Sequence, residues 1–125
     1  MQVVTYKQMA RLTTHVLDIA RGKPAAGIAI RLYSCSGDER LLLKSVTTNA
    51  DGRTDEPLLQ GNDLHAGSYE LVFSAGDYHR AQKVQLDSPP FLDKVVVRFG
   101  VSDPSANYHV PLLLSPYGYS TYRGS

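Results

Sequence analysis

Cysteine is almost absent from this sequence. Cys35 is the single cysteine among 125 residues. One thiol cannot form an intrachain disulfide, and it does not supply the paired thiolates of a structural zinc site. We therefore expect the chain to be stabilised by the packing of its side chains, and Cys35 to be a small buried hydrophobic residue.

Net charge is also nearly absent. Thirteen lysines and arginines are balanced by twelve aspartates and glutamates, which leaves a formal charge of +1. Nonspecific binding to nucleic acid depends on a strongly basic surface that neutralises phosphates. We therefore expect no nucleic-acid partner and no attraction to acidic membranes.

Long hydrophobic runs are missing as well. No segment approaches the roughly 20 apolar residues that are needed to cross a bilayer. Lys7 and Arg11 interrupt residues 1–11, which lack the apolar centre of a signal peptide. The expected protein is soluble and cytoplasmic, with no membrane-bound segment.

The composition that remains is typical of a folded protein. Hydrophobic residues make up 42% of the chain and charged residues 20%, which is close to the average for globular domains. The length of 125 residues suits one domain. We expect that domain to span residues 12–125, after an N-terminal segment at residues 1–11 that could be flexible.

Short apolar runs separated by turn residues predict an all-β sandwich. The predicted strands are residues 13–19, 27–33, 41–48, 68–73, 92–99, 107–115 and 119–123. Residues 57–64 are expected to form a loop or a short edge strand, because proline lacks the amide that a central strand needs. In the first strand both alternating sides carry polar and apolar residues, so neither side is plainly a solvent face.

Turn and helix signals complete this prediction. Asp51 and Gly52 are a strong turn pair, because glycine accepts a positive φ. Ser74 and Asp77 are spaced as in a capping box, which predicts one short helix of two or three turns ending near Gln82.

Common catalytic motifs are not present. The sequence has no glycine-rich phosphate loop, no nucleophile elbow and no HExxH helix. Residues 49–56 are rich in oxygen ligands, but Arg53 follows the glycine and no glutamate closes a twelve-residue calcium loop. A plain turn is the expected structure there, and Arg53 by itself could be a solvated turn residue.

The four histidines fall into two pairs. His15 and His109 lie in predicted strands among apolar residues, whereas His65 and His79 lie in loop or helix contexts where a solvated imidazole costs little. A lone strand histidine is more often structural than catalytic. The residues alone therefore lead to an all-β sandwich with a possible polar site formed by His15, Arg53 and His109.

Tyrosine is concentrated near the C-terminus. Four of the eight tyrosines fall in the last eighteen residues, namely Tyr108, Tyr117, Tyr119 and Tyr122. Tyrosine buries an apolar ring while its hydroxyl stays satisfied, so core or interface packing is the simplest interpretation. A strand that continues almost to Ser125 would also hold the terminal carboxylate in place.

Three stretches resemble the transthyretin-like family, in particular its enzymatic branch, the 5-hydroxyisourate hydrolases of purine catabolism. They are residues 12–25 (LTTHVLDIARGKPA), 48–59 (TNADGRTDEPLL) and 108–125 (YHVPLLLSPYGYSTYRGS). The final YRGS is the most specific element, because the hydrolases end on it and the hormone-carrying transthyretins do not. Ile19 departs from the threonine that is usual in the family, at a position outside the proposed site.

The resemblance implies a fold and an assembly. The family has a two-sheet sandwich of about eight strands with one short helix, assembled as a homotetramer, a dimer of dimers. Its active sites lie in the channel between dimers. His15, Arg53 and His109 match the active-site residues of the family, and Tyr122 to Ser125 complete the site.

The resemblance also implies a reaction without metal or organic cofactor. Water would open a cyclic amide of 5-hydroxyisourate to give 2-oxo-4-hydroxy-4-carboxy-5-ureidoimidazoline. A histidine is a suitable general base near neutral pH, and His15 and His109 are both candidates. His15, Arg53 and Tyr122 would bind the substrate. Arg53 would also stabilise the oxyanion, and Ser125 would orient water or a substrate oxygen.

Two non-catalytic alternatives stay open at this point. The first is a transthyretin-like carrier of a small aromatic ligand, against which the YRGS end argues. The second is a sandwich that acts as an interaction or carbohydrate-binding module, since a fold does not determine a function. In that second case His15, Arg53 and His109 would have no reason to converge.

Overall fold

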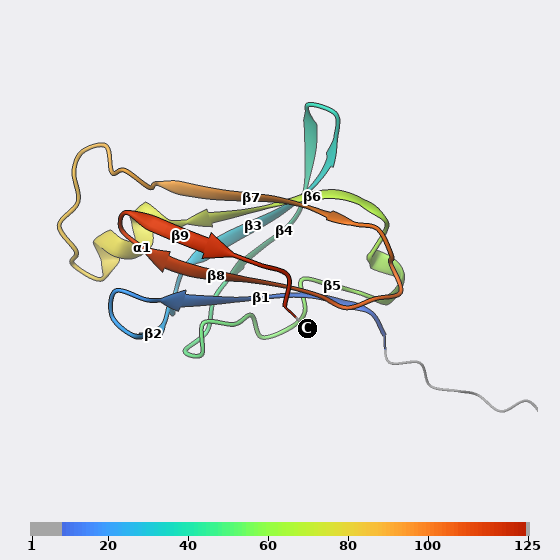
Figure 1. The fold of residues 1–125 in the computed structure, drawn as a ribbon, viewed down its shortest axis with the longest axis horizontal. Coiled ribbons are helices and arrows are strands. Elements are labelled where there is room, and N and C mark those ends of the chain that lie inside the picture. Colours follow the sequence, from blue (N-terminus) through green and yellow to red (C-terminus); the bar gives the residue numbers. More distant parts are fainter. Residues whose placement is uncertain (1–8, 125) are drawn as a thin grey trace, which may run out of the picture.

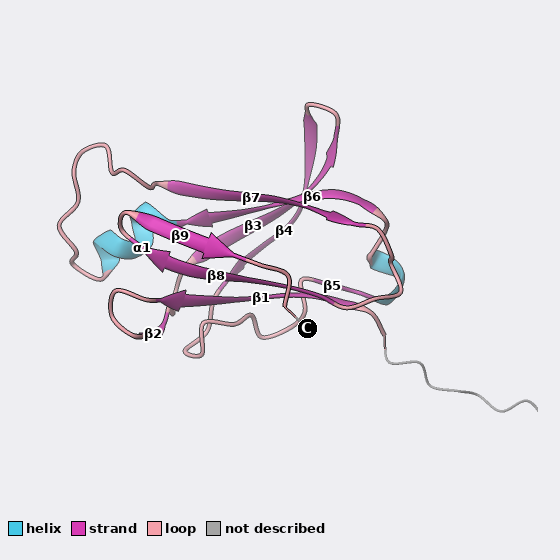
Figure 2. Cartoon of the chain, viewed as in Figure 1, coloured by secondary structure: helices cyan, strands magenta, loops and turns pink. Residues whose placement is uncertain are grey.

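Two β-sheets pack face to face in the computed structural model, which describes residues 9–124 (Figures 1 and 2). One sheet has the strand order β2-β1-β8-β9, with β5 paired to β1, and the other has the order β4-β3-β6-β7. The strands are β1 (Arg11–Asp18), β2 (Lys23–Pro24), β3 (Ala29–Ser36), β4 (Glu39–Thr47), β5 (Leu59–Gln60), β6 (Gly67–Ser74), β7 (Lys94–Val101), β8 (Tyr108–Ser115) and β9 (Gly118–Thr121). The predicted all-β sandwich is confirmed.

Strands β1 and β8 pair in parallel and join the two ends of the chain. Thr13 lies opposite His109, and His15 lies opposite Pro111. The other paired strands are antiparallel. Because this pairing is parallel, outward-facing residues of β1 run alongside outward-facing residues of β8 in the same direction.

The buried faces of both sheets form one apolar core. Its largest fully buried side chains are Phe73, Leu12, Ile28, Ile30, Leu32, Leu58, Leu71, Leu112, Leu114, Val16 and Val95. Burial of each such side chain contributes about 1.5–3 kcal/mol relative to its exposure to water. The packing of this core therefore stabilises a chain that cannot form an intrachain disulfide.

The two sides of strand β1 differ in burial, although both carry polar and apolar residues. Leu12, Thr14, Val16 and Asp18 are buried, and the residues between them are half-buried or exposed. Thr14 satisfies its hydroxyl by donating to the carbonyl of Val110 over 2.7 Å. The buried side therefore carries polar groups that are hydrogen-bonded within the fold.

The predicted short helix is present as α1 (Ala75–Ala81), but the predicted capping box is wrong. The Ser74 side chain makes no capping hydrogen bond. Its hydroxyl instead accepts a hydrogen bond from Nζ of Lys94 at 3.1 Å. Asp77 pairs with Arg80 at 3.2 Å and with Lys94 at 3.7 Å, so nearby cations hold both side chains away from the helix amides.

The expectation of a solvated His79 is also wrong, because this side chain is only 1% exposed. Helix α1 covers one end of the sandwich (Figure 1), and it buries Tyr78 as well. The hydroxyl of Tyr78 donates to Oδ2 of buried Asp18 at 2.8 Å. Desolvation lowers the pKa of His79 below the ordinary histidine value, against an opposing effect of the Asp18 charge. His65, in contrast, is exposed as expected.

The ends of several elements differ from their predicted positions. The strand expected at 92–99 is displaced towards its C-terminal side, and β9 ends at Thr121 rather than at residue 123. Residues 57–64 contain β5 and a 3-10 helix (Gly61–Asp63). Cys35 is half-buried on β3 rather than fully buried.

The predicted N-terminal segment falls mostly outside the described residues. Within that segment, Arg11 already belongs to β1. Among the described helices, none is long and apolar enough to cross a membrane.

Candidate functional site

The candidate site lies on the outer face of the β1–β8 pair, where half-buried His15 and His109 project from neighbouring strands. Arg53 reaches this face from a loop. Its backbone forms an isolated antiparallel bridge with His15. The structure therefore brings together the two strand histidines and the arginine that the sequence singled out.

The turn at residues 49–53 delivers Arg53 to this position. Oδ1 of Asn49 accepts hydrogen bonds from the amides of Asp51 at 2.9 Å and Arg53 at 3.2 Å. Gly52 has a φ of +73°. A Cβ at Gly52 would lie 2.3 Å from the carbonyl oxygen of Val16, so a larger residue does not fit without movement of the backbone. The Asp51–Gly52 turn predicted from the sequence is confirmed.

One ring nitrogen of His15 is hydrogen-bonded to a backbone carbonyl of this same turn. Nε2 of His15 lies 2.8 Å from the backbone oxygen of Asp51. A carbonyl oxygen only accepts hydrogen bonds, so Nε2 carries the proton. In the neutral ring, the lone pair is therefore on Nδ1.

His109 is held on both sides of its ring. Nδ1 lies 2.8 Å from the hydroxyl oxygen of Thr13. The terminal segment holds the backbone of His109, because the amide of Gly124 donates to the carbonyl of His109 at 2.7 Å. A Cβ at Gly124 would lie 2.7 Å from Cδ2 of His109, so the terminal segment packs closely against the imidazole.

The charges of the site act on His109. Burial is the largest cause that lowers the pKa of His109 below the ordinary value; the positive charge of Arg53 lowers it further, and so does His15 when its ring is protonated. His109 is therefore neutral at neutral pH. His109 is the member of this group whose charge is disfavoured by its neighbours.

The segment after β9 continues alongside β8, antiparallel to it, as far as Gly124. The guanidinium of Arg123 lies 4.2 Å from the ring centre of Tyr108, and its Nη2 donates to the carbonyl of Asn107 at 3.1 Å. These contacts fix the approach of Gly124 to His109. Arg123 and Tyr108 also line a cavity of about 230 Å³ between β7 and β8.

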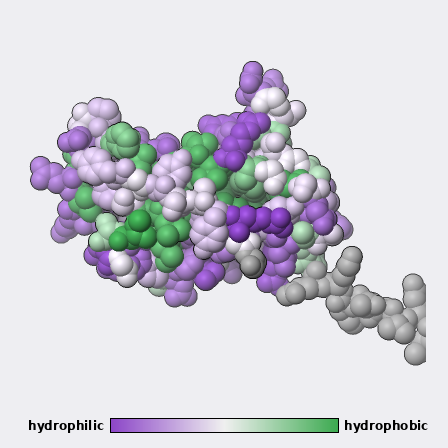
Figure 3. All heavy atoms as spheres, in the orientation of Figure 1, coloured by the Kyte–Doolittle hydropathy of each residue, from purple (hydrophilic) through white to green (hydrophobic). Residues whose placement is uncertain are grey.

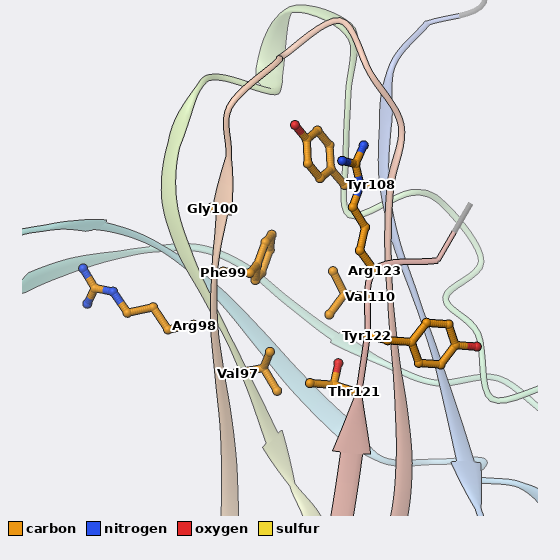
Figure 4. Close-up of a pocket in the computed structure, with 9 residues that line it drawn as sticks. All are labelled: Val97, Arg98, Phe99, Gly100, Tyr108, Val110, Thr121, Tyr122 and Arg123. Atoms are coloured by element: carbon orange, nitrogen blue, oxygen red, sulfur yellow. The ribbon is translucent and has the colours of Figure 1, made fainter.

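Tyr122 is 59% exposed. In Figure 4 its ring points away from Phe99 and the other apolar residues of that cavity. A second cleft of about 230 Å³ is lined by Thr13, Arg53 and residues 54–57 among others, and so adjoins the site. The predicted role of Ser125 lies outside the described residues.

Two contributors were not singled out from the sequence, Thr13 and the carbonyl of Asp51, whereas Gly124 belongs to the terminal segment that the resemblance placed in the site. Thr13 and Gly124 act through pairing with β8, which periodicity along the chain does not reveal. No group of three or more His, Cys, Asp or Glu within residues 9–124 is arranged to hold a metal ion.

Comparison with known proteins gives a consistent result. Residues 12–124 match the HIUase/Transthyretin family. The chain is 63% identical over 115 residues to the 5-hydroxyisourate hydrolase of Mesorhizobium japonicum, with 92% of each protein covered. It is 59% identical over 117 residues to the 5-hydroxyisourate hydrolase of Pseudomonas aeruginosa, which covers 94% of this chain and 93% of that protein.

A solved structure agrees with these relatives. The 5-hydroxyisourate hydrolase of Klebsiella pneumoniae matches with a TM-score of 0.76 and 31% identity, over 93% of this chain and 99% of that one. The similarity therefore extends over both sheets and over the strands that carry His15 and His109.

Proposed function

Because this chain belongs to the HIUase/Transthyretin family, we infer that it is a 5-hydroxyisourate hydrolase of urate degradation. The family that three sequence stretches indicated is confirmed. The observation that carries the function is the convergence of His15, Arg53 and His109 on one face, in a chain so similar to named hydrolases.

The reaction is hydrolysis of a ring amide. Water adds to the carbonyl carbon, and negative charge develops on the carbonyl oxygen. The carbon–nitrogen bond then breaks, the nitrogen takes up a proton, and the ring opens to a carboxylate. Water is a weak nucleophile at neutral pH, so the site has to remove its proton as the bond forms.

His15 is the proposed general base. The carbonyl of Asp51 keeps the proton on Nε2, and this leaves the lone pair of the neutral ring on Nδ1. The same hydrogen bond persists after Nδ1 has taken a proton from water. His15 therefore changes its charge without turning its ring.

Arg53 and His109 are proposed to act on the substrate. The guanidinium is a fixed positive charge with a planar set of donors, which suits a polar heterocycle and a developing oxyanion. His109 is neutral because burial and the neighbouring charges lower its pKa. It thus offers Nε2 as a hydrogen-bonding partner without adding a second positive charge.

Tyr122 and Ser125 are proposed to complete the substrate site. Tyr122 is exposed on the segment that leads to Gly124, which contacts His109. We propose that Tyr122 contacts the substrate and that Ser125 orients water or a substrate oxygen. No metal or organic cofactor enters the proposed steps.

We propose that the chain assembles as a homotetramer, a dimer of dimers, and acts in the cytoplasm. The support for assembly is the outer face of the β1–β8–β9 sheet, where Ile19, directly after β1, is 52% exposed. Figure 3 shows apolar residues gathered on this side, over β1 and β8. Half-buried Leu17 and Leu113 belong to the same face. Burial of this face between dimers would enclose the site.

Turnover distinguishes the hydrolase from a ligand carrier. 5-Hydroxyisourate is generated from urate by urate oxidase, and its ultraviolet absorbance is followed at several protein concentrations far below that of the substrate. A hydrolase raises the decay rate in proportion to its concentration, above the spontaneous rate. An unchanged rate, together with stoichiometric binding of an aromatic ligand, would support the carrier instead.

A further inference from the structure

We propose that Thr13 is a positioning residue for His109, which holds the imidazole by Nδ1 so that Nε2 is the nitrogen presented to the substrate. This inference rests on the proposed hydrolase function. It assigns a role to a residue that touches His109 rather than the reacting atoms.

The pairing of β1 with β8 sets up the contact. Thr13 lies directly opposite His109 in the parallel register. Both side chains are half-buried on the outer face, and the Thr13 hydroxyl oxygen lies 2.8 Å from Nδ1. Because both residues lie on central strands of one sheet, the contact does not depend on a mobile loop.

The opposite side of the ring is blocked. The contact of Gly124 with Cδ2 of His109 leaves no space for even a methyl group. Arg123 secures this segment through Tyr108 and the carbonyl of Asn107. A flip of the imidazole would exchange Nδ1 with Cδ2, bring a carbon against the Thr13 hydroxyl and lose the hydrogen bond.

A hydroxyl is suited to this position because it both donates and accepts. It donates to Nδ1 when that nitrogen carries the lone pair, and it accepts from Nδ1 when the ring is protonated. A carboxylate in its place would raise the pKa of His109, whereas burial and the Arg53 charge lower it. Thr13 therefore fixes the orientation of the ring without stabilising its charged form.

The neighbouring Thr14 provides a matched control. Its hydroxyl also bonds across to β8, but on the buried side, where it donates to the carbonyl of Val110. A change of Thr14 to valine removes a strand-to-strand hydrogen bond on the buried side of β1, although Thr14 also borders the cleft beside Arg53, and it leaves the Thr13–His109 contact in place. If Thr13 were merely structural, the two threonines would behave alike.

The experiment compares Thr13→Val, Thr13→Ser and Thr14→Val in the full chain. Steady-state rates on 5-hydroxyisourate, pH–rate profiles and thermal unfolding are measured for each. Thr13→Val is expected to lose roughly 10- to 100-fold in kcat, which is the scale for misplacing a catalytic group. Thr13→Ser should recover most of this loss, and Thr14→Val should lower the unfolding temperature while kcat stays near wild type.

Nitrogen-15 NMR of the imidazoles gives a readout that needs no substrate. In wild type, Nδ1 of His109 should show the chemical shift of a hydrogen-bonded nitrogen, and Thr13→Val should shift this signal because the bond is lost. Wild-type kcat in Thr13→Val, or an unchanged Nδ1 signal of His109, would overturn the proposal. If the wild-type protein does not accelerate decay, the proposed function fails instead, while the NMR comparison still decides how the ring is held.

Discussion

His15 and Arg53 are joined by an antiparallel backbone bridge, and the carbonyl of Asp51 in the adjoining turn accepts a hydrogen bond from Nε2 of His15. One short loop therefore places the proposed oxyanion-binding group and sets the tautomer of the proposed base. The integrity of that loop should matter as much as the side chains it carries.

Gly52→Ala should disrupt this loop. The residue has a φ of +73°, and the added Cβ would meet the Val16 carbonyl at 2.3 Å. A left-handed conformation alone costs a non-glycine residue about 1–2 kcal/mol. The variant should lose both stability and most hydrolysis of 5-hydroxyisourate, as measured by thermal unfolding and absorbance decay.

Gly22→Ala is the matched control for that variant. Gly22 has a similar φ of +68°, but nothing lies within 4 Å of its added Cβ. It should lose some stability and keep its activity. Equal activity losses in the two variants would contradict the role given to the loop.

His15→Ala should remove the general base. The expected decrease in kcat is about 10²- to 10⁴-fold. Added imidazole should restore part of the activity, because a small base can occupy the vacated space. His65→Ala, at an exposed loop position, should keep the wild-type rate. Wild-type kcat in His15→Ala would exclude His15 as the base.

Arg53→Gln should raise the pKa of His109. The positive charge of Arg53 contributes to the lowered pKa of this histidine, so its removal makes protonation easier. NMR titration of His109 in both proteins measures the shift without any substrate. Arg31→Gln, at an exposed position on β3, should leave the titration unchanged. An unshifted His109 in Arg53→Gln would mean that the two groups do not interact.

The stability of the protein should fall in mild acid because of His79. Burial lowers its folded-state pKa, whereas the unfolded chain has an ordinary value near 6.5. Protons therefore bind the unfolded state first as the pH falls below about 6.5, and this shifts the equilibrium towards unfolding. Above that pH the contribution to stability is fully present.

Unfolding by denaturant between pH 8 and pH 5.5, at one protein concentration, measures this effect. His79→Phe should show a smaller loss of stability with acid than wild type, and His65→Phe should behave like wild type. A pH dependence that is identical in wild type and His79→Phe would exclude His79 as its source.

Much of this fold could be predicted from local pattern. Alternation and turn residues indicate the strands and the Asp51–Gly52 turn, because both depend on neighbours in the chain. The pairing of β1 with β8 could not be predicted this way, since it joins residues far apart in sequence. Thr13 was missed as a partner of His109 for this reason.

The two wrong predictions, the capping box at Ser74 and the solvated His79, have similar causes. Ser74 and Asp77 have the spacing of a capping box, but Lys94, which lies opposite Ser74 on the adjacent strand β7, contacts both side chains. His79 has the sequence context of an exposed helix residue, but α1 turns it inward over the end of the sandwich. Tertiary contacts override local preference in both cases.

The central claim is that His15, Arg53 and His109 form a site that hydrolyses 5-hydroxyisourate. The most direct test is the absorbance decay of freshly generated 5-hydroxyisourate with wild-type protein, Arg53→Ala and the surface control Arg31→Ala. Wild type and Arg31→Ala should accelerate the decay equally, and Arg53→Ala should lose about 10²- to 10³-fold, the scale for removal of one oxyanion-stabilising donor. Full activity in a folded Arg53→Ala protein, or no acceleration by wild type, would contradict this account.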